Sequence, residues 1–399
     1  MQKKYDIAAY IWPAYTGQEP RTKIFWPEDI GEWQTVRDTV MDIPEINYHW
    51  DRKPLWGYRD EADPKVMEFQ IEEAVKHGVN VFIYDWYWYE SRPFLEQCLD
   101  DGFLKAPNKD KMKFYIMWAN HDVNYTWDKR NSDMVQTSNP TIWDGFVDRK
   151  QFDVIVDRMI SKYFSQPNYY KIDGKPVFMI YSLGNLIHGL GGFEATREAL
   201  ESFKAKTVEA GFPGLDIQMV SYGSGVENES GVDGGEKVSR KEIAESVGVT
   251  SVSNYQFCHF MRMKNHYSAL VDAAEREWNS MIDTYSVPYY PHVSVGWDAN
   301  PRYNVHHENV CHGNTPELVE DAFRRARNFV DAHIDKLKAP LITVNSWNEW
   351  TETSYLQPDN VYGYGYLEAV KRVFVDEVNE QSFLEKRLQN VQVGCKTHE

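Results

Sequence analysis

Closely spaced cysteines are missing from this sequence. The four cysteines stand at positions 98, 258, 311 and 395, with no repeated short interval between them. Small secreted folds that depend on disulfides carry clustered cysteines, so this class is excluded and a reducing compartment fits. No apolar run reaches the length of a bilayer-spanning helix either, and we expect no membrane span.

A long run of lysine and arginine is also missing. The formal net charge is -17, whereas nucleic-acid binding requires a concentrated basic surface, so we expect no nucleic-acid partner. No secretory signal precedes the first predicted strand, which begins at about Tyr5. We expect a cytoplasmic protein for the chain as it stands, or a periplasmic or extracellular one if a signal peptide was removed. The oligomeric state is unknown from the sequence.

The chain does contain a regular alternation of apolar and amphipathic segments. The predicted strands are 5–12, 79–84, 113–117, 176–180, 216–220, 250–253, 290–295 and 341–344. The predicted helices are 63–77, 152–163, 193–210, 241–247, 266–285, 315–337 and 366–378. Parallel strands joined by crossover helices produce this alternation. Eight strands favour a closed (β/α)8 TIM barrel over an open doubly wound sheet, because the glycines of 223–235 lack a phosphate-binding spacing.

The fold class is therefore predicted to be α/β, with a single catalytic barrel over 1–380 and a C-terminal tail over 381–399. Long irregular stretches follow strands rather than helices, at 13–61, 122–150, 223–240 and 298–314. TIM-barrel enzymes build their sites from the loops at the C-terminal face of the strands. We expect the functional site on that face.

Aromatic residues are abundant, at 15% of the chain, and one stands at the end of each of the eight predicted strands. The residues at these ends are Trp12, Asp85, Trp86, Tyr87, Trp88, Trp118, Asn120, His121, Tyr181, Tyr222, Tyr255, Trp297, Asp298, Trp347, Asn348 and Glu349. Tryptophan and tyrosine combine an apolar face with a polar edge, which suits sugar rings. Two or three are expected to pack the top layer of the barrel. The others are predicted to line a carbohydrate cleft.

The last predicted strand leads into the stretch LITVNSWNEWTETSYLQPD, from Leu341 to Asp359. Glu349 and Glu352 form the best acid–base pair in the sequence, because cleavage of a glycosidic bond needs one group that protonates the departing oxygen and another that assists attack. The alternative is a pair of structural, salt-bridged glutamates. Asp85 and Asp298 are rival carboxylates, which we expect to hold a sugar hydroxyl or a neighbouring arginine.

A metal site is the remaining chemical alternative. His306, His307, Cys311 and His312 are residue types that bind zinc, but their spacing matches no common zinc pattern. We therefore predict no metal and no cofactor. His121 is either a substrate hydrogen-bond partner or a structural histidine.

Several segments carry a resemblance to a known family. They are FIYDWYWYESRPFLEQCLD (82–100), FYIMWANHDVNYTWD (114–128), YYKIDGKPVFMIYS (169–182), VGWDANPR (295–302), NSWNEWTETSYLQPD (345–359) and YGYGYLEAV (362–370). In this order they resemble the WbsX-like group, which is related to glycoside hydrolase family 99 and its endo-α-mannosidases. The resemblance implies a metal-independent (β/α)8 barrel that cleaves internal α-mannosidic bonds with retention.

The same resemblance implies a role for each carboxylate. Glu349 would deprotonate the 2-hydroxyl of the sugar, which then attacks the anomeric carbon and forms a 1,2-anhydro sugar. Glu352 would protonate the leaving group and then deprotonate the incoming water. The predicted substrate-binding residues are Trp12, Asp85, Trp86, Tyr87, Trp118, Asn120, His121, Tyr181, Tyr255, Trp297, Asp298, Arg302, Trp347, Asn348 and Trp350.

We therefore predict an endo-acting glycoside hydrolase whose partner is an oligo- or polysaccharide with α-mannose-like or related units. One alternative is a glycosyltransferase of surface-polysaccharide biosynthesis, because the carboxylate pair does not say whether water or a sugar is the acceptor. The chain has no D-x-D element and no basic diphosphate cradle, which ranks this alternative second. The other alternative is a catalytically silent glycan-binding protein, which would not need the pair.

Overall fold

The computed structural model describes residues 5–138, 140–222 and 239–377. Residues 223–238 of the glycine-rich loop, and the predicted tail over 381–399, lie outside the described residues. Within the described ranges, eight parallel strands form one sheet in the order β10-β9-β8-β6-β4-β1-β12-β11. The strands are β1 (Asp6–Ile11), β4 (Val81–Tyr89), β6 (Lys113–Trp118), β8 (Lys175–Ile180), β9 (Asp216–Val220), β10 (Ser251–Ser253), β11 (His292–Ser294) and β12 (Leu341–Asn345).

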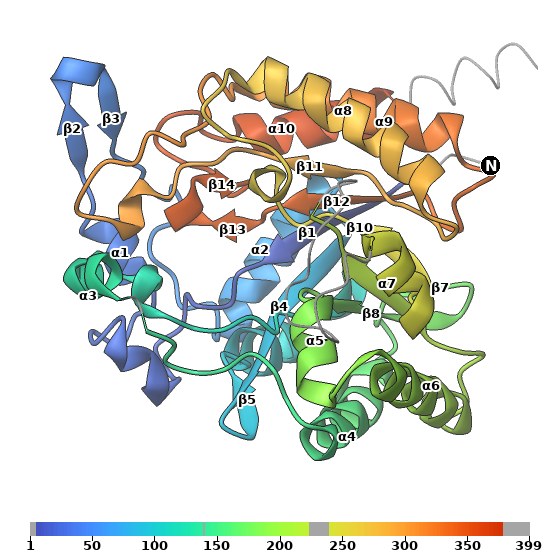
Figure 1. Cartoon of the computed structure of the whole chain (residues 1–399). Coiled ribbons are helices and arrows are strands. Elements are labelled where there is room, and N and C mark those ends of the chain that lie inside the picture. Colours follow the sequence, from blue (N-terminus) through green and yellow to red (C-terminus); the bar gives the residue numbers. More distant parts are fainter. Residues whose placement is uncertain (1–4, 139, 223–238, 378–399) are drawn as a thin grey trace, which may run out of the picture.

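The two ends of this sheet approach each other. Val252 in β10 forms a parallel bridge with Tyr289, just before β11. The Val252 N–H donates to the Pro288 carbonyl at 2.9 Å, and the Tyr290 N–H donates to the Val252 carbonyl at 2.9 Å. The sheet is thus nearly closed into a barrel with the helices around it (Figure 1), and the prediction of a TIM barrel is confirmed.

The helices around the barrel follow the predicted alternation. They are α2 (Pro64–Lys76), α4 (Arg149–Arg158), α6 (Phe193–Glu209), α7 (Arg240–Val247), α8 (Tyr267–Thr284), α9 (Pro316–Ala332) and α10 (Gly365–Lys371). Asp63 begins α2, because its side chain accepts from the Lys65 N–H at 2.9 Å and Pro64 occupies the first turn. Helix α5 (Leu183–Leu190) was not predicted; it begins directly after β8, where the Ser182 hydroxyl caps it. None of the described helices is both long enough and apolar enough to cross a membrane.

The long loop after β1 carries structure of its own. It contains α1 (Trp33–Arg37) and the hairpin of β2 (Met41–Ile43) and β3 (Tyr48–Trp50), which lies at the edge of the molecule in Figure 1. The loop returns to the end of β1 twice, because the Glu32 N–H donates to the Ala14 carbonyl and the Glu61 N–H to the Tyr15 carbonyl. Two glutamates that are far from the barrel strands in sequence are thereby brought to its C-terminal face.

Several other short elements lie in the loops around the barrel strands. They are β5 (Arg92–Phe94), which pairs with β4, β7 (Lys171–Ile172), which pairs with β8, the hairpin β13 (Asn348–Glu349) and β14 (Ser354–Tyr355), and α3 (Ser132–Thr137). The hairpin β13–β14 follows β12 and holds the Glu-Trp-Thr-Glu sequence at the barrel's C-terminal end.

Candidate active site

A cavity of about 150 Å³ lies at the C-terminal end of the barrel. Its lining combines carboxylates, one arginine and aromatic rings from several strand ends: Trp12, Asp85, Tyr87, Met117, Ala119, His121, Trp127, Tyr181, Tyr255, Arg302, Glu349 and Glu352. This is the face on which TIM-barrel enzymes place their catalytic groups. Nine of the predicted site residues therefore meet in one cavity.

The two predicted catalytic glutamates reach this cavity from the β13–β14 hairpin. Glu349 pairs with Ser354 across the hairpin, and the 3₁₀ turn Trp350–Glu352 closes it. The Ser346 hydroxyl braces the turn, since it accepts from the Glu349 N–H at 2.7 Å and donates to the Ser354 carbonyl at 2.7 Å. Both glutamates line the cavity from this hairpin and its turn.

Arg302 binds both carboxylates. Its Nη2 donates to Glu349 Oε1 and its Nη1 to Glu352 Oε1, each at 2.7 Å, while its Nε donates to Thr351 Oγ1 at 2.8 Å. The side chain of Arg302 is only 11% exposed. A buried, planar guanidinium that donates to several fixed acceptors determines their relative positions as well as supplying charge. Arg302 therefore sets the relative position of the two glutamates.

A third glutamate, Glu32, supports this arrangement and was not predicted. It is fully buried in the loop after β1. Its carboxylate accepts from Thr351 Oγ1 at 2.9 Å and from the Trp12 indole N–H, and Oε1 lies 3.6 Å from Arg302 Nε. Glu32 precedes a short helix in a stretch without periodicity, so no pattern in the sequence marks it.

Burial raises the proton affinity of the carboxylates at this site. Desolvation raises the pKa of Glu349 well above its usual value, and the nearby Glu352 raises it further. Burial also raises the pKa values of Glu352 and Glu32, although Arg302 opposes the shift in both. Because one guanidinium faces several carboxyls, the site is suited to hold at least one of them protonated near neutral pH.

Two carboxyl oxygens in the cavity are left for a ligand. Asp85 Oδ2 accepts from the Tyr255 hydroxyl at 2.8 Å, but Asp85 Oδ1 and Glu352 Oε2 are buried with no hydrogen-bond partner among the described residues. Buried polar atoms in native proteins are nearly always paired. A hydroxyl or glycosidic oxygen of a bound sugar would supply the missing partners.

Aromatic rings form the walls of the cavity. Trp12 contacts Tyr87 at 5.8 Å and Trp127 at 5.2 Å between ring centroids, both edge to face. Tyr181 contacts Tyr255 at 5.4 Å in the same manner. Trp127 was not among the predicted residues, because it lies in a 3₁₀ turn (Tyr125–Trp127) of the long loop after β6.

Other predicted aromatic residues lie outside the cavity lining and inside the core. Trp86, Trp118, Trp347 and Trp350 are buried, and three of their indole N–H groups bond to the protein itself, with Glu96, Gln70 and Gln357 as acceptors. Three of the strand-end aromatics, Trp86, Trp118 and Trp347, therefore lie in the core, within the two or three that were expected. Strand alternation is the reason: Asp85 and Tyr87 line the cavity whereas Trp86 points to the opposite face.

The two predicted amides also act as structural residues. Asn120 donates to the Ser182 carbonyl and accepts from the Ser182 N–H, each at 2.7 Å. Asn348 bridges the backbone of Trp12, since its Oδ1 accepts from the Trp12 N–H and its Nδ2 donates to the Trp12 carbonyl. Both amides tie neighbouring strand ends together, and neither belongs to the cavity lining.

A buried carboxylate, Glu61, lies beside the β13–β14 hairpin, where Asn348 donates to it. Its oxygens accept from Gln70 Nε2 at 3.0 Å, Gln357 Nε2 at 3.1 Å and Asn348 Nδ2 at 2.9 Å. Burial raises the pKa of Glu61 to about 7, although these hydrogen bonds act in the opposite direction. Gln70 and Gln357 therefore accept hydrogen bonds from the indoles of Trp347 and Trp350 and donate hydrogen bonds to Glu61.

Trp297 and Asp298 lie in a different cavity, of about 420 Å³. Asp298 accepts from the Tyr48 hydroxyl at 2.8 Å, and its backbone N–H donates to the Glu352 carbonyl at 2.7 Å, so it braces the hairpin. The candidate zinc ligands His306, Cys311 and His312 line this same cavity, and His307 packs on Tyr303. Within the described ranges, no group of three or more His, Cys, Asp or Glu side chains could hold a metal ion.

Comparisons with known sequences place the whole barrel in one family. A family model described as "Glycosyltransferase WbsX" matches residues 7–370. Two proteins described as "Uncharacterized protein WxcX", from two strains of Xanthomonas campestris pv. campestris, are 22% identical over 364 residues. The match covers 88% of this chain and 47% of each relative. The chain thus spans about half the length of the curated relatives it matches.

Comparisons with solved structures identify similar folds. The GH99 endo-alpha-mannosidase from Bacteroides thetaiotaomicron has a TM-score of 0.60 at 12% identity, covering 94% of this chain and 97% of that one. A "Glycoside hydrolase-like protein" has a TM-score of 0.58 at 14% identity, covering 94% and 95%. At these identities the likeness is one of fold.

Proposed function

The chain belongs to the WbsX glycosyltransferase family, and from this membership and the cavity geometry we propose a glycan-active enzyme that hydrolyses internal glycosidic bonds. Glu349 and Glu352 are its catalytic carboxylates. The substrate is an oligo- or polysaccharide with α-mannose-like or related units. No metal or cofactor takes part in the proposed reaction.

One observation carries this proposal. Arg302 brings two buried carboxylates together in a cavity walled by aromatic rings, and one of them, Glu352, has an oxygen without a partner among the described residues. A carboxyl whose pKa is raised by burial can hold a proton near neutral pH and deliver it to a departing oxygen. Glycan cleavage needs such a group beside a second carboxylate.

The free oxygen of Glu352 supports Glu352 as the acid, which leaves Glu349 as the base although burial raises its pKa as well. In the first step, Glu349 takes the proton of the sugar 2-hydroxyl, the 2-oxygen attacks the anomeric carbon, and Glu352 Oε2 donates its proton as the glycosidic bond breaks. In the second step, Glu352 takes a proton from water, which opens the 1,2-anhydro ring, and Glu349 returns its proton to the 2-oxygen. Two inversions give retention of configuration.

The cavity walls support a sugar as the ligand. Ring faces of Trp12, Tyr181 and Tyr255 surround carboxylate oxygens at Asp85 and Glu352, and sugars need this combination of apolar contact and hydrogen bonding. Relatives of the same fold include a protein described as an endo-alpha-mannosidase. We therefore favour an internal α-mannose-like linkage over a terminal one.

Product release from a glycan panel tests the proposal. Native protein, Glu349→Gln and Glu352→Gln are incubated with α-mannans, N-glycan fragments and bacterial surface polysaccharides, without a nucleotide sugar. Oligosaccharide release by the native chain and its loss in both variants is the expected result. Release of monosaccharides alone would contradict the endo-acting part of the proposal.

A glycosyltransferase is the second candidate, because the matching family is described as one. The same carboxylates could activate an acceptor sugar in place of water. Turnover only when a sugar donor and an acceptor are both supplied would favour this candidate. Glycan binding unchanged by Glu349→Gln, together with no turnover under either condition, would identify a glycan-binding protein.

A further inference from the structure

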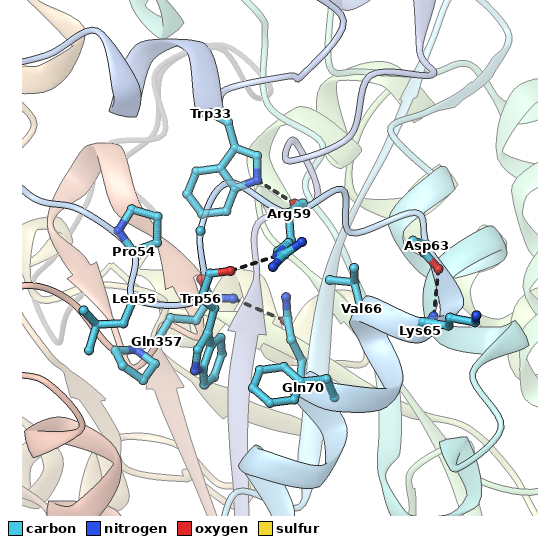
Figure 2. Close-up of a pocket in the computed structure, with 13 residues that line it drawn as sticks. Trp33, Pro54, Leu55, Trp56, Arg59, Asp63, Lys65, Val66, Gln70 and Gln357 are labelled. Atoms are coloured by element: carbon cyan, nitrogen blue, oxygen red, sulfur yellow. Dashed lines mark hydrogen bonds between the residues drawn. The ribbon is translucent and has the colours of Figure 1, made fainter.

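A second cavity, of about 460 Å³, lies beside the catalytic hairpin (Figure 2). It is bounded by the 54–59 segment, the first turns of α2 and the Gln357–Pro358 segment. Trp33 connects it to the catalytic site, since its ring lies 5.8 Å from that of Trp350 and its neighbour Glu32 accepts from Thr351. Trp33 therefore packs against the segment that carries Glu349 and Glu352.

The walls of this second cavity are apolar rings. The Trp33 indole N–H donates to the Arg59 carbonyl at 2.7 Å, and the Trp56 indole N–H donates to the Tyr364 hydroxyl at 2.8 Å. Both indole donors are thus used within the protein, and the rings offer only their carbon surfaces. Phe69 adds a third ring that is 45% exposed. An exposed ring beside a cavity can pack against the apolar face of a ligand.

The floor of the cavity offers few free hydrogen-bonding groups. Gln70 Oε1 accepts from the Trp347 indole, and Gln357 Oε1 accepts from the Trp350 indole, each at 2.7 Å. The amide nitrogens of both glutamines donate to Glu61. Polar recognition must therefore come from the rim.

The rim carries two cations with no carboxylate in ion-pair range among the described residues. Figure 2 shows Arg59 between Trp33 and Trp56; its Nε donates to the Trp56 carbonyl at 3.0 Å, which leaves the two terminal nitrogens available. Lys65 is exposed on the first turn of α2. The acidic residue of the rim, Asp63, is engaged as the N-cap of α2, where its Oδ1 accepts from the Lys65 N–H.

Arg59 differs from the arginines of this chain that are neutralised by several carboxylates. The net charge is -17, and arginines elsewhere, such as Arg37 and Arg325, each bind two or more carboxylates. A guanidinium beside aromatic rings and free of an internal carboxylate is suited to bind a ligand carboxylate through two parallel hydrogen bonds. A sugar ring that carries a carboxylate matches both the rings and the cations.

We propose that this second cavity binds an acidic sugar unit, a uronic acid, of the glycan on which the enzyme acts. The inference rests on the proposed function only for the identity of that glycan. The sugar ring packs against Trp56 and Phe69, its carboxylate pairs with Arg59, and Lys65 adds long-range attraction. The cavity thereby selects acidic glycans at a distance from the bond that is cleaved.

Calorimetric titration of the full chain tests this site. The Glu349→Gln protein is titrated with a galacturonic acid trimer and with the matching galactose trimer, so that binding is measured without turnover. We expect the acidic trimer to bind at millimolar concentration or below, with an affinity that falls as salt rises. Arg59→Ala should weaken this binding by about tenfold or more and leave the neutral trimer unaffected.

Three further variants distinguish the effect of charge from the effect of ring contact. Arg276→Ala removes an exposed arginine on α8, outside this cavity, and serves as the control for loss of one charge; it should leave the binding unchanged. Phe69→Ala removes an exposed ring and should weaken the acidic trimer without altering thermal stability. Arg59→Lys should bind with intermediate affinity, because it keeps the charge but loses the paired donors.

Several results would contradict the proposed acidic-sugar site. They are no binding of the acidic trimer at millimolar concentration, equal affinity for both trimers, and equal losses in Arg59→Ala and Arg276→Ala. The proposed hydrolase fails independently, if the native chain releases no product while the acidic trimer still binds through Arg59. The two proposals are therefore distinguished by separate measurements.

Discussion

Arg302 donates one hydrogen bond to Glu349 and one to Glu352, through different terminal nitrogens and at the same 2.7 Å distance. A single guanidinium therefore fixes the separation of the two carboxylates. It also provides one positive charge to a site that contains Glu32 and Asp85 as well. The protonation of the pair, and hence its chemistry, depends on this cation.

Replacement of Arg302 by methionine should shift the pH dependence of the enzyme. Arg302 lowers the pKa of both glutamates, so its removal raises both pKa values. Glu349 must be ionised to act as the base, and the acidic limb of the kcat/KM profile should therefore move to higher pH. We expect kcat/KM at the optimum to fall by about 10²–10³-fold, because an oriented charge is lost. The measurement is kcat/KM from pH 4 to pH 9.

Arg276→Met is the matched control, because Arg276 is exposed on α8 and lies outside the cavity lining. It should leave the acidic limb in place. An Arg302→Met profile with a lower plateau and an unmoved acidic limb would show that the arginine positions the substrate without tuning the carboxylates.

The two glutamates should respond differently to the leaving group. Glu352→Gln removes the proposed acid, so a substrate with an activated aryl leaving group, which needs no proton, should recover most of the lost rate of the first step, seen as aryl release in the first turnover, while the second step stays slow. Glu349→Gln removes the proposed base and should stay slow, by about 10³-fold or more, with either leaving group. Initial rates on an aryl glycoside and on a natural linkage test this difference. Recovery of the rate with the aryl glycoside in Glu349→Gln alone would mean that Glu349 is the acid and Glu352 the base.

Much of the barrel could be predicted because its strands are apolar runs interrupted by turn residues. The strand predicted to begin at residue 113 corresponds to β6, which begins at Lys113, and the stretch LITVN forms β12. Glu349 and Glu352 could be found as well, since charged residues directly after a buried strand stand at the site face of a barrel. These signals are local and need no knowledge of distant contacts.

The supporting residues could not be predicted, because long-range contacts place them. Glu32 reaches Arg302 through a loop with no periodicity, and Trp127 enters the cavity from a turn of another loop. The aromatic strand ends were assigned to the cleft too broadly. Alternation within a strand divides them, so that Met117 lines the cavity whereas Trp118 is buried in the core. The alternation of side chains in β4 continues beyond residue 84 and places Tyr87 and Trp86 on opposite faces of the strand.

Glu61 should make the stability of the protein depend on pH. Burial raises its pKa to about 7, above the value in the unfolded chain, so the folded state binds the extra proton between these values. Stability should therefore fall as pH rises from about 5 to about 8, by on the order of 2–3 kcal/mol from this group alone. Glu61→Gln lacks this contribution. Chemical unfolding at several pH values should show a smaller slope for the variant.

The same substitution should also cost stability at every pH. The indoles of Trp347 and Trp350 can only donate, so Gln70 and Gln357 must turn their amide nitrogens toward Glu61. A glutamine at 61 can offer its Oε1 to these two amides, but its own Nε2 then faces Asn348 Nδ2, donor against donor, at a cost of about 1–3 kcal/mol. Glu72→Gln, on the exposed side of α2, is the control and should change neither quantity. Equal pH slopes for native protein and Glu61→Gln would contradict the assignment.

Asp85 should lower the stability of the folded protein and strengthen substrate binding. Burial raises its pKa well above the usual value, and Oδ1 has no partner within the described part of the chain. A buried carboxyl with a raised folded pKa destabilises the protein as pH rises through that pKa, so Asp85→Asn should gain about 1–3 kcal/mol of unfolding free energy at pH 8 and little at pH 4. The asparagine can still accept from Tyr255 but presents an amide to the sugar, so KM should rise by about tenfold.

Tyr255→Phe is the control variant: it removes the donor to Asp85 Oδ2 and should destabilise the protein instead. An Asp85→Asn protein that is less stable than the native chain at pH 8 would mean that Asp85 is a structural residue, satisfied by its surroundings rather than by a ligand.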